Sequence, residues 1–207
     1  MLIEKFTVGP LETNCYIVSD AGSKEALIID PGDEPDLLID YIKGNNLILK
    51  YIICTHCHFD HIAVLSDIKE ATGASVVIHK DDLDLYNNIQ KQGLMWGFEI
   101  EPLPEPDIFV SDGDILTIGK IEFKILHTPG HSPGGLCILS GGILFSGDTL
   151  FYGSVGRTDL PGGNIEKLKK SFKYLMELPE KTIVMPGHGP ETTIGKEKID
   201  NFFSFQV

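Results

Sequence analysis

Short apolar runs alternate with turn-forming residues along the first quarter of the chain. The runs at residues 2–8, 15–19 and 26–29 are rich in residues that favour strands, and Gly, Pro and Asp separate them. The pattern then changes at residues 34–43, where Leu37, Leu38, Tyr41 and Ile42 share one helical face and Gly44 follows as a stop. These patterns predict a sheet of neighbouring strands followed by a first helix.

The next apolar run, at residues 47–54, leads into a polar stretch that is rich in histidine. Helical spacing resumes after that stretch at Ile62, Leu65 and Ile68, and it ends at Gly73. A strand at 75–79 and a short helix at 81–88 follow. Residues 89–106 contain Trp96, two glycines and three prolines, so we predict a loop there that lies over a site.

The second half repeats the mixture of strands and helices. Strands are predicted at 121–127, 136–139, 143–146 and 182–185, with helices at 165–177 and 195–200. Asn164 is a suitable N-cap for the longer helix. No long Ser/Gly/Pro linker divides the chain, so residues 1–207 are predicted to form a single domain of the α/β class, with two sheets covered outside by helices.

The amino-acid composition makes some classes of binding partner less favourable. The 207 residues include 30 acidic and 17 basic side chains, which gives a net charge of -13. Such a charge opposes binding to nucleic acids and to anionic membranes. No apolar run reaches the length of a bilayer span, and the N-terminus lacks the features of a signal peptide. Four cysteines are too few for a disulfide scaffold, so we expect a cytoplasmic protein.

The histidine-rich stretch carries the strongest chemical signal. It reads His56-x-His58-x-Asp60-His61 and stands between a strand and a helix. In extended backbone, positions two apart share a face, so His56, His58 and Asp60 are expected to converge. Imidazole and carboxylate groups are good ligands for zinc, iron and manganese. Adjacent imidazoles would repel one another once protonated, and this makes a purely structural role unattractive. The stretch therefore predicts a metal site.

Three further ligand-type residues follow apolar strands in turns that contain glycine or proline. They are His131 in Pro129-Gly130-His131, Asp148 in Ser146-Gly147-Asp148, and His188 in Pro186-Gly187-His188. Glycine lets the backbone approach a metal pocket closely, and proline restricts the turn. With the first cluster, these residues are predicted to complete two metal sites.

The order of these seven residues resembles the signature of the metallo-β-lactamase superfamily. The resemblance implies an αββα sandwich of two mixed sheets with the metals at one edge between them. It also implies that His56, His58 and His131 hold one divalent ion, that Asp60, His61 and His188 hold the other, and that Asp148 bridges. Zinc is the expected metal, with iron or manganese as alternatives.

Within that superfamily, the chain most resembles the glyoxalase II-like hydrolases. The resemblance is carried by the segments at 147–151, 156–159 and 187–195. It implies hydrolysis of a small anionic thioester, such as hydroxyacylglutathione, by a metal-bound hydroxide. Asp60 would orient the nucleophile as a ligand, or act as general base if one metal is bound. Glyoxalase II continues into a helical extension beyond the position of Val207, so the thiol carrier and the acyl group stay open.

Three other classes of function compete with this interpretation. Relatives with the same signature include sulfur dioxygenases that use one iron and act on persulfides. The metal content of the protein distinguishes such a dioxygenase from a hydrolase. A nuclease would use the same ligands but needs a basic surface, which the net charge of -13 opposes. A non-catalytic module is disfavoured because structural zinc sites close their coordination with protein ligands. Oligomeric state is not encoded in any pattern that we recognise.

A few residues outside the ligand set are secondary candidates. Tyr152 and Trp96 are predicted substrate contacts, and Arg157 and Asp159 are predicted to pair. Cys54 and Cys57 have C-x-x-C spacing, but no second such pair exists, so packing is the simpler role. Two strand-end histidines either pack or orient the ligands; they are His79 and His127.

Overall fold

Two six-stranded mixed sheets form the centre of the computed structural model, which describes residues 1–206. The first sheet has the order β1 (Leu2–Val8), β2 (Thr13–Ser19), β3 (Glu25–Ile29), β4 (Ile48–Ile53), β5 (Ser75–His79) and β6 (Ile108–Val110). The second has the order β14 (Thr192–Thr193), β13 (Ile183–Pro186), β10 (Ile143–Gly147), β9 (Leu136–Ser140), β8 (Ile121–His127) and β7 (Ile115–Ile118). A small ribbon pairs β11 (Leu150–Phe151) with β12 (Ser154–Val155).

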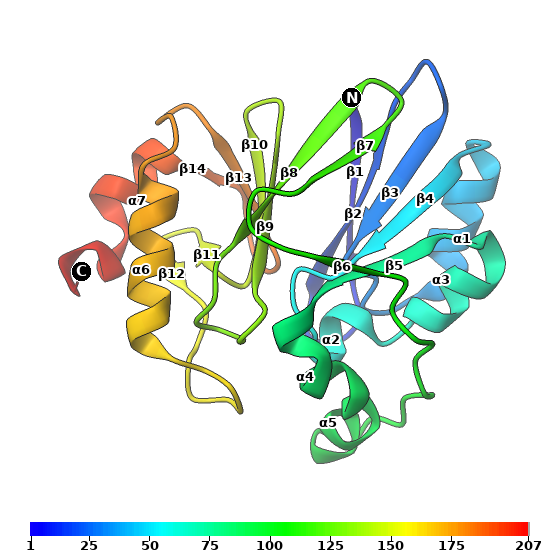
Figure 1. The fold of residues 1–207 in the computed structure, drawn as a ribbon, viewed down its shortest axis with the longest axis horizontal. Helices are drawn as coiled ribbons and strands as arrows, with labels where there is room; N and C mark the ends of the chain where they lie inside the picture. Colours follow the sequence, from blue (N-terminus) through cyan, green and yellow to red (C-terminus); the bar gives the residue numbers. More distant parts are fainter. Residues whose placement is uncertain (207) are drawn as a thin grey trace.

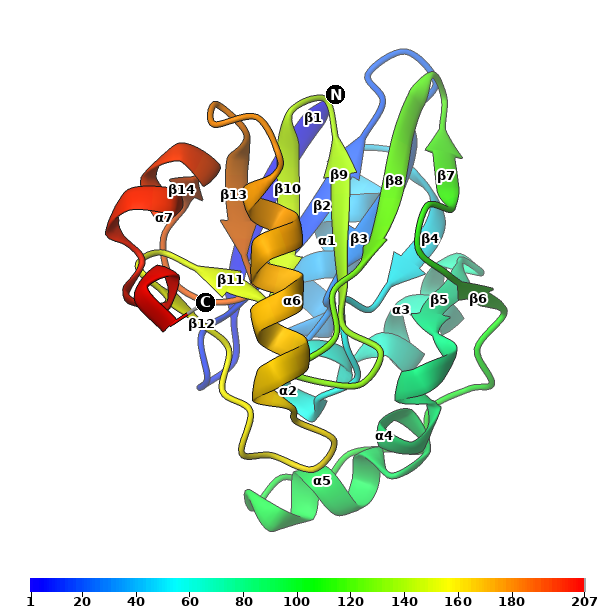
Figure 2. The same ribbon diagram turned by 60° about the vertical axis from the view of Figure 1, so that its left-hand side comes forward.

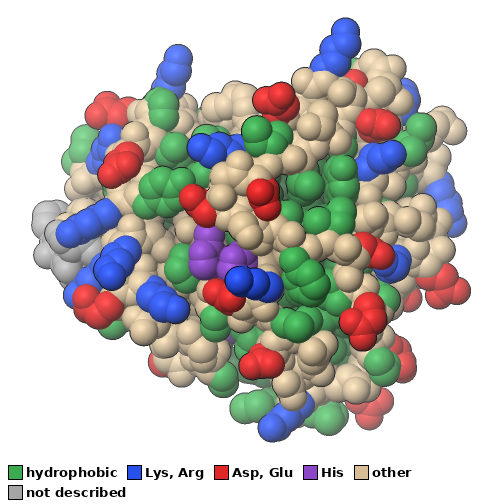
Figure 3. All heavy atoms as spheres, in the orientation of Figure 1, with side chains coloured by type: hydrophobic (Ala, Val, Ile, Leu, Met, Phe, Trp, Pro, Cys, Tyr) green, Lys and Arg blue, Asp and Glu red, His purple; other side chains and the backbone are tan. Residues whose placement is uncertain are grey.

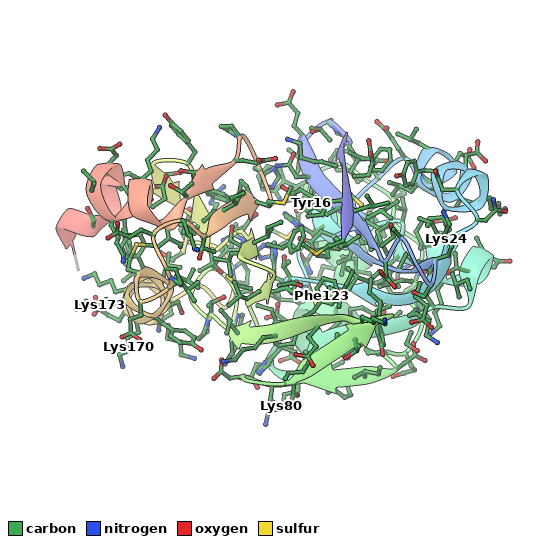
Figure 4. The ribbon with its side chains drawn as sticks, turned by 90° about the horizontal axis from the view of Figure 1, so that it is seen from above. Tyr16, Lys24, Lys80, Phe123, Lys170 and Lys173 are labelled. Atoms are coloured by element: carbon green, nitrogen blue, oxygen red, sulfur yellow. The ribbon has the colours of Figure 1, made fainter. Side chains whose placement is uncertain are left out.

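The two sheets face each other across a shared apolar layer. Tyr16 and Val77 from the first sheet belong to the same buried cluster as Phe123 and Phe145 from the second. Figure 4 shows Tyr16 and Phe123 between the two sheets. Burying a large apolar side chain stabilises the fold by about 1.5–3 kcal/mol, so this layer accounts for much of the attraction between the sheets.

Helices cover the two outer faces, as Figure 1 shows. The first sheet is covered by α1 (Pro35–Gly44) and α3 (Leu65–Thr72), whose Leu38, Ile42 and Ile68 pack in one buried cluster with strand residues. The second is covered by α6 (Ile165–Met176) and α7 (Ile194–Asp200). Figure 2 shows α6 lying across the face of its sheet. The predicted αββα sandwich is therefore confirmed.

The longest helix, α6, illustrates how the sequence produces its layer. The Asn164 side chain accepts a hydrogen bond from the Lys167 backbone nitrogen at 2.9 Å, so the predicted N-cap is present. Leu168 and Phe172 are buried against the sheet. Lys170 and Lys173 point away from it in Figure 4. The helical period thus separates an apolar face from a charged face.

One predicted loop is wrong over part of its length. Residues 89–106 were expected to form a loop, but α5 (Ile89–Met95) begins the segment, directly after η1 (Lys80–Asp82) and α4 (Leu83–Asn87). One of the two glycines that suggested a loop, Gly93, lies inside the helix, where a Cβ would come within 2.7 Å of Ile100 Cδ1. That glycine serves close packing of the returning chain, and it does not break the helix.

Other boundaries differ by small amounts. The helix predicted after the histidine cluster divides into α2 (Phe59–Ile62) and α3. The chain ends in the short helix η2 (Phe202–Gln206). No helix in residues 1–206 is long and apolar enough to cross a membrane.

Candidate metal centre

The predicted ligands follow four strands that end at the same edge of the sandwich. His56, His58, Asp60 and His61 come after β4, His131 after β8, Asp148 after β10, and His188 after β13. Strands β10 and β13 run parallel, and β8 has the same direction because β9 is antiparallel to both β8 and β10. The order and direction of the strands therefore bring these loops together. His56 and His188 are 132 residues apart in the sequence.

The side chains gather into two triads. The first is His56, His58 and His131, and the second is Asp60, His61 and His188; within each, the ligand atoms lie within 4.8 Å of one another. The expectation that Asp60 converges with His56 and His58 is wrong in detail. Helix α2 begins at Phe59, so the alternation of extended backbone ends at His58 and Asp60 turns toward the second triad.

Asp148 lies between the triads. Its Oδ2 atom is 3.5 Å from His131 Nε2, and its Oδ1 atom is 3.5 Å from His61 Nε2. This is the placement that the family resemblance implies for a bridging ligand. Gly187 stands close beside it, since a Cβ there would come within 2.3 Å of Asp148 Oδ1.

The donor set fits divalent cations. His58 Nδ1 faces His131 Nε2 at 2.9 Å, and His61 Nε2 faces His188 Nε2 at 3.2 Å. Three buried atoms have no hydrogen-bond partner among the described residues, namely His56 Nε2, His58 Nε2 and Asp148 Oδ1. Buried polar atoms almost always have a partner, so the unpaired His56 Nε2 and Asp148 Oδ1 in one cluster indicate a site for a metal.

Hydrogen bonds from neighbouring residues orient the imidazoles. His61 Nδ1 donates to Asp30 Oδ2 at 2.9 Å, and His131 Nδ1 donates to the Arg157 carbonyl at 2.7 Å. Each bond fixes a proton on Nδ1 and directs Nε2 toward the cluster. Thr55 Oγ1 donates to Asp30 Oδ2 at 2.6 Å and lies 3.1 Å from His56 Nδ1. Because the hydroxyl proton points to Asp30, Oγ1 accepts from His56, so His56 is also protonated on Nδ1.

The role of Asp30 was missed at the sequence level. The Asp30-Pro31-Gly32 segment reads as a turn after a strand, and no local pattern separates a turn aspartate from one that supports a metal ligand. Asp30 is 1% exposed and has a φ of 54°, a left-handed conformation that is uncommon for residues other than glycine. A strained, buried carboxylate beside two ligands is a signal that only coordinates reveal.

Electrostatics differ between the two triads. Burial and the neighbouring His131 lower the pKa of His58 to about 3, and burial is also the main reason that the pKa of His56 is low. Burial acts in the same direction on His61, but Asp148, Asp60 and Asp30 outweigh it and raise the pKa of His61 to about 10. Burial opposes ionisation of Asp60, yet His61 and His188 hold the pKa of Asp60 low. At neutral pH, His56 and His58 therefore present free lone pairs, whereas the metal-free second triad holds a proton on His61.

A cavity of about 310 Å³ opens onto the cluster. His58, Asp60, His131, Asp148 and His188 contribute to its lining. Figure 3 shows histidine side chains at the surface in a hollow bordered by acidic, basic and apolar groups. The remaining lining residues are mostly apolar, and they include Leu11, Phe59, Leu85, Met95, Trp96, Leu160 and Pro161.

The secondary candidates lie in different places. Trp96 lines the cavity and packs near Phe59, with ring centroids 6.2 Å apart. Tyr152 is not among the described lining residues, and Lys196 Nζ donates to its hydroxyl at 2.6 Å, so its placement does not support a substrate contact. Its side chain comes from the β11–β12 turn, whose direction no sequence pattern specifies.

Arg157 pairs with Asp159 through two hydrogen bonds of 2.6 Å, as predicted, and it lines the cavity. His79 and His127 stack on each other at 3.9 Å, and neither belongs to the two triads. All four cysteines are free and buried, and burial raises the pKa of Cys54 and Cys57. Both thiols therefore stay protonated and pack as apolar groups, as expected.

Fold and site together define a metal-dependent hydrolase of the αββα type. A family model described as the metallo-beta-lactamase superfamily matches residues 8–188, and the chain belongs to that superfamily. The chain is 37% identical to a hydroxyacylglutathione hydrolase, GloC, of Haemophilus influenzae, and the match covers 98% of each protein.

Two solved structures are similar over nearly their whole length. One, TTHA1623 in a di-iron-bound form, is 41% identical with a TM-score of 0.89, and the match covers 97% of this chain and 99% of the other. The second, the B3 metallo-beta-lactamase BLEG-1, is 37% identical with a TM-score of 0.90, covering 98% and 99%.

Proposed function

We propose that the protein is a dinuclear metal-dependent hydrolase that cleaves a small anionic thioester. The position of Asp148, in reach of both triads at 3.5 Å, is the observation that carries the proposal. The similarity to a protein solved with two irons supports two ions per chain, and the similarity to a hydroxyacylglutathione hydrolase supports a thioester. Zinc is the first metal that we expect, with iron or manganese as alternatives.

Two bound divalent ions would lower the pKa of a water molecule and polarise the thioester carbonyl. The first ion would be held by His56, His58 and His131, the second by Asp60, His61 and His188, and Asp148 would bridge. The chain needs no nucleophile of its own, in keeping with the protonated state of its buried cysteines.

Asp60 is the residue that we expect to handle the proton of the attacking water. Its Oδ2 atom lies 3.4 Å from His188 Nε2 and 3.6 Å from His61 Nε2, and Thr13 Oγ1 donates to it at 3.5 Å. With two ions bound, Asp60 would orient the water as a ligand; with one, its carboxylate would accept the proton.

Substrate charge and shape follow from the cavity walls. Among the lining residues that the structure describes, Arg157 is the one lysine or arginine, and Asp159 holds its guanidinium. Asp159 takes bonds from Arg157 Nε and Nη2, and we expect the remaining N–H donors of the guanidinium to bind a carboxylate of the substrate. Trp96 and Met95 form an apolar wall that we expect to receive the carbon chain of the substrate.

The setting of the reaction is part of the proposal. Four buried, free cysteines support work in the reducing cytoplasm. The net charge of -13 supports a small-molecule substrate over a nucleic acid or a membrane surface.

Metal analysis of the purified protein, with S-lactoylglutathione hydrolysis assayed on the same sample, tests the proposal. About two ions per chain with thioester turnover would support it. One iron per chain with persulfide-dependent oxygen uptake and no hydrolysis would replace it with the sulfur dioxygenase reading.

A further inference from the structure

A buried carboxylate joins the two loops that supply the first triad. Asp82 is the last residue of η1 and is 1% exposed. Its Oδ2 atom accepts hydrogen bonds from the Cys57 backbone nitrogen at 3.0 Å and from Ser132 Oγ at 2.8 Å. Its Oδ1 atom accepts from the Gly134 backbone nitrogen at 2.5 Å. Asp82 is in neither ligand triad, so it acts on the site through other residues.

The partners of Asp82 are immediate neighbours of metal ligands. Cys57 stands between His56 and His58, and Ser132 follows His131. The approach of Asp82 to the turn requires glycine at position 134, because a Cβ at Gly134 would come within 2.8 Å of Asp82 Cγ. One carboxylate therefore sets the separation between a loop after β4 and a loop after β8, which belong to different sheets.

Other contacts hold the bases of these loops. The Leu136 backbone nitrogen donates to the Thr55 carbonyl at 2.7 Å, and the Thr128 nitrogen donates to the Gly135 carbonyl at 2.7 Å. These bonds lie outside the 131–134 turn. Asp82 holds the turn itself, together with a bond from the Gly130 nitrogen to the Ser132 carbonyl at 2.9 Å and a contact of 3.1 Å between His127 Nε2 and the Pro133 carbonyl. The Arg157 carbonyl then sets the orientation of the His131 ring. The position of His131 thus depends on Asp82, whereas the orientation of its ring depends on the Arg157 carbonyl.

We propose that Asp82 is a positioning residue for the His56–His58–His131 triad, so that metal affinity at this triad depends on its carboxylate while the Asp60–His61–His188 triad does not. The proposal rests on metal binding by the triads, which is part of the proposed function, and it is independent of the substrate.

A change of Asp82→Asn tests the proposal with almost no change in shape. Both carboxylate oxygens accept from a backbone N–H, so either orientation of the amide places its NH₂ group against a donor. Groups that orient metal ligands typically contribute about 10–100-fold to metal affinity. We expect one of two zinc affinities to fall by that factor, measured by competition with a chromogenic chelator, and the other to stay within about threefold.

Glu197→Gln is the matched control. Glu197 is 0% exposed, and its carboxylate accepts from the Gly153 nitrogen at 2.8 Å, from Asn201 Nδ2 at 2.7 Å and from Thr192 Oγ1 at 2.5 Å. This variant should lose a similar amount of thermal stability and keep both zinc affinities. Ser132→Ala is a milder second variant that removes one bond to Asp82, and we expect a loss of a few-fold at the same single site.

The outcomes separate the two proposals. Native affinity at both sites in Asp82→Asn and Ser132→Ala overturns the role of Asp82, as does an equal loss in Glu197→Gln. Failure of the unchanged protein to bind zinc, iron or manganese overturns both proposals. A protein that shows the expected affinity pattern but hydrolyses no thioester supports the role of Asp82 and overturns the proposed substrate. Should Asp82→Asn fail to fold, Ser132→Ala decides.

Discussion

Replacing Gly32 by alanine should damage the second triad through the backbone alone. Gly32 follows β3 and is buried against α2, which carries Asp60 and His61. A Cβ on Gly32 would lie 1.8 Å from the Asp60 carbonyl oxygen and 2.9 Å from its carbonyl carbon. Both atoms are backbone, so no flexible side chain can move aside.

The size of the effect follows from that overlap. Nonbonded heavy atoms settle about 3.5 Å apart, so one backbone segment has to shift by roughly 1.7 Å. Metal–ligand distances tolerate about 0.2 Å, which is far less than this shift. Overpacking of this kind costs about 1–3 kcal/mol, and in a chain of this length it lowers Tm by roughly 2–12 °C. We expect the affinity of the second triad to fall by at least about tenfold.

Gly44→Ala supplies the control. Gly44 is the last residue of α1, and a Cβ there would meet nothing within 4 Å. Alanine at this position should be neutral or slightly stabilising. Thermal melts with chelator and with zinc measure stability, and zinc per chain after gel filtration measures the site. Native Tm and full zinc content in Gly32→Ala would refute the steric argument.

Three further predictions concern charge and substrate. Because the pKa of His61 is raised from 6.5 to about 10, its stabilisation of the metal-free protein is complete below pH 6.5 and lost as pH rises through 10. Urea unfolding at several pH values in chelator should show that fall. Zinc binding at pH 7 should release the His61 proton, which calorimetry in buffers of different ionisation enthalpy detects. Arg157→Ala should raise KM for anionic thioesters by about tenfold while kcat changes little, since the carbonyl that holds His131 remains; an unchanged KM would contradict the carboxylate contact. Trp96→Ala should raise KM several-fold, whereas Leu94→Ala, exposed and outside the described lining, should not; equal effects would remove the apolar wall from substrate binding.

Local sequence patterns determined most of the secondary structure. The strands predicted at 2–8, 75–79 and 121–127 are those observed, and the cap at Asn164 is present. Periodicity and capping depend on neighbouring residues, so they can be recognised without the fold. The residues that gather in the two triads were also visible, because imidazoles and carboxylates in glycine-containing turns after apolar strands have few structural uses.

Tertiary structure decided which of those residues belong to which triad. The start of α2 at Phe59 assigned Asp60 to the second triad, and the chain reversal after α5 explained a glycine that had suggested a loop. It also gave Asp30 and Asp82 their roles, through contacts that span 31 residues to His61 and 50 residues to Ser132. A buried aspartate and a turn aspartate look alike in a sequence. They differ in the hydrogen-bond donors that the folded chain brings to their oxygens. Those donors come from distant segments, which meet only because the two sheets share one edge.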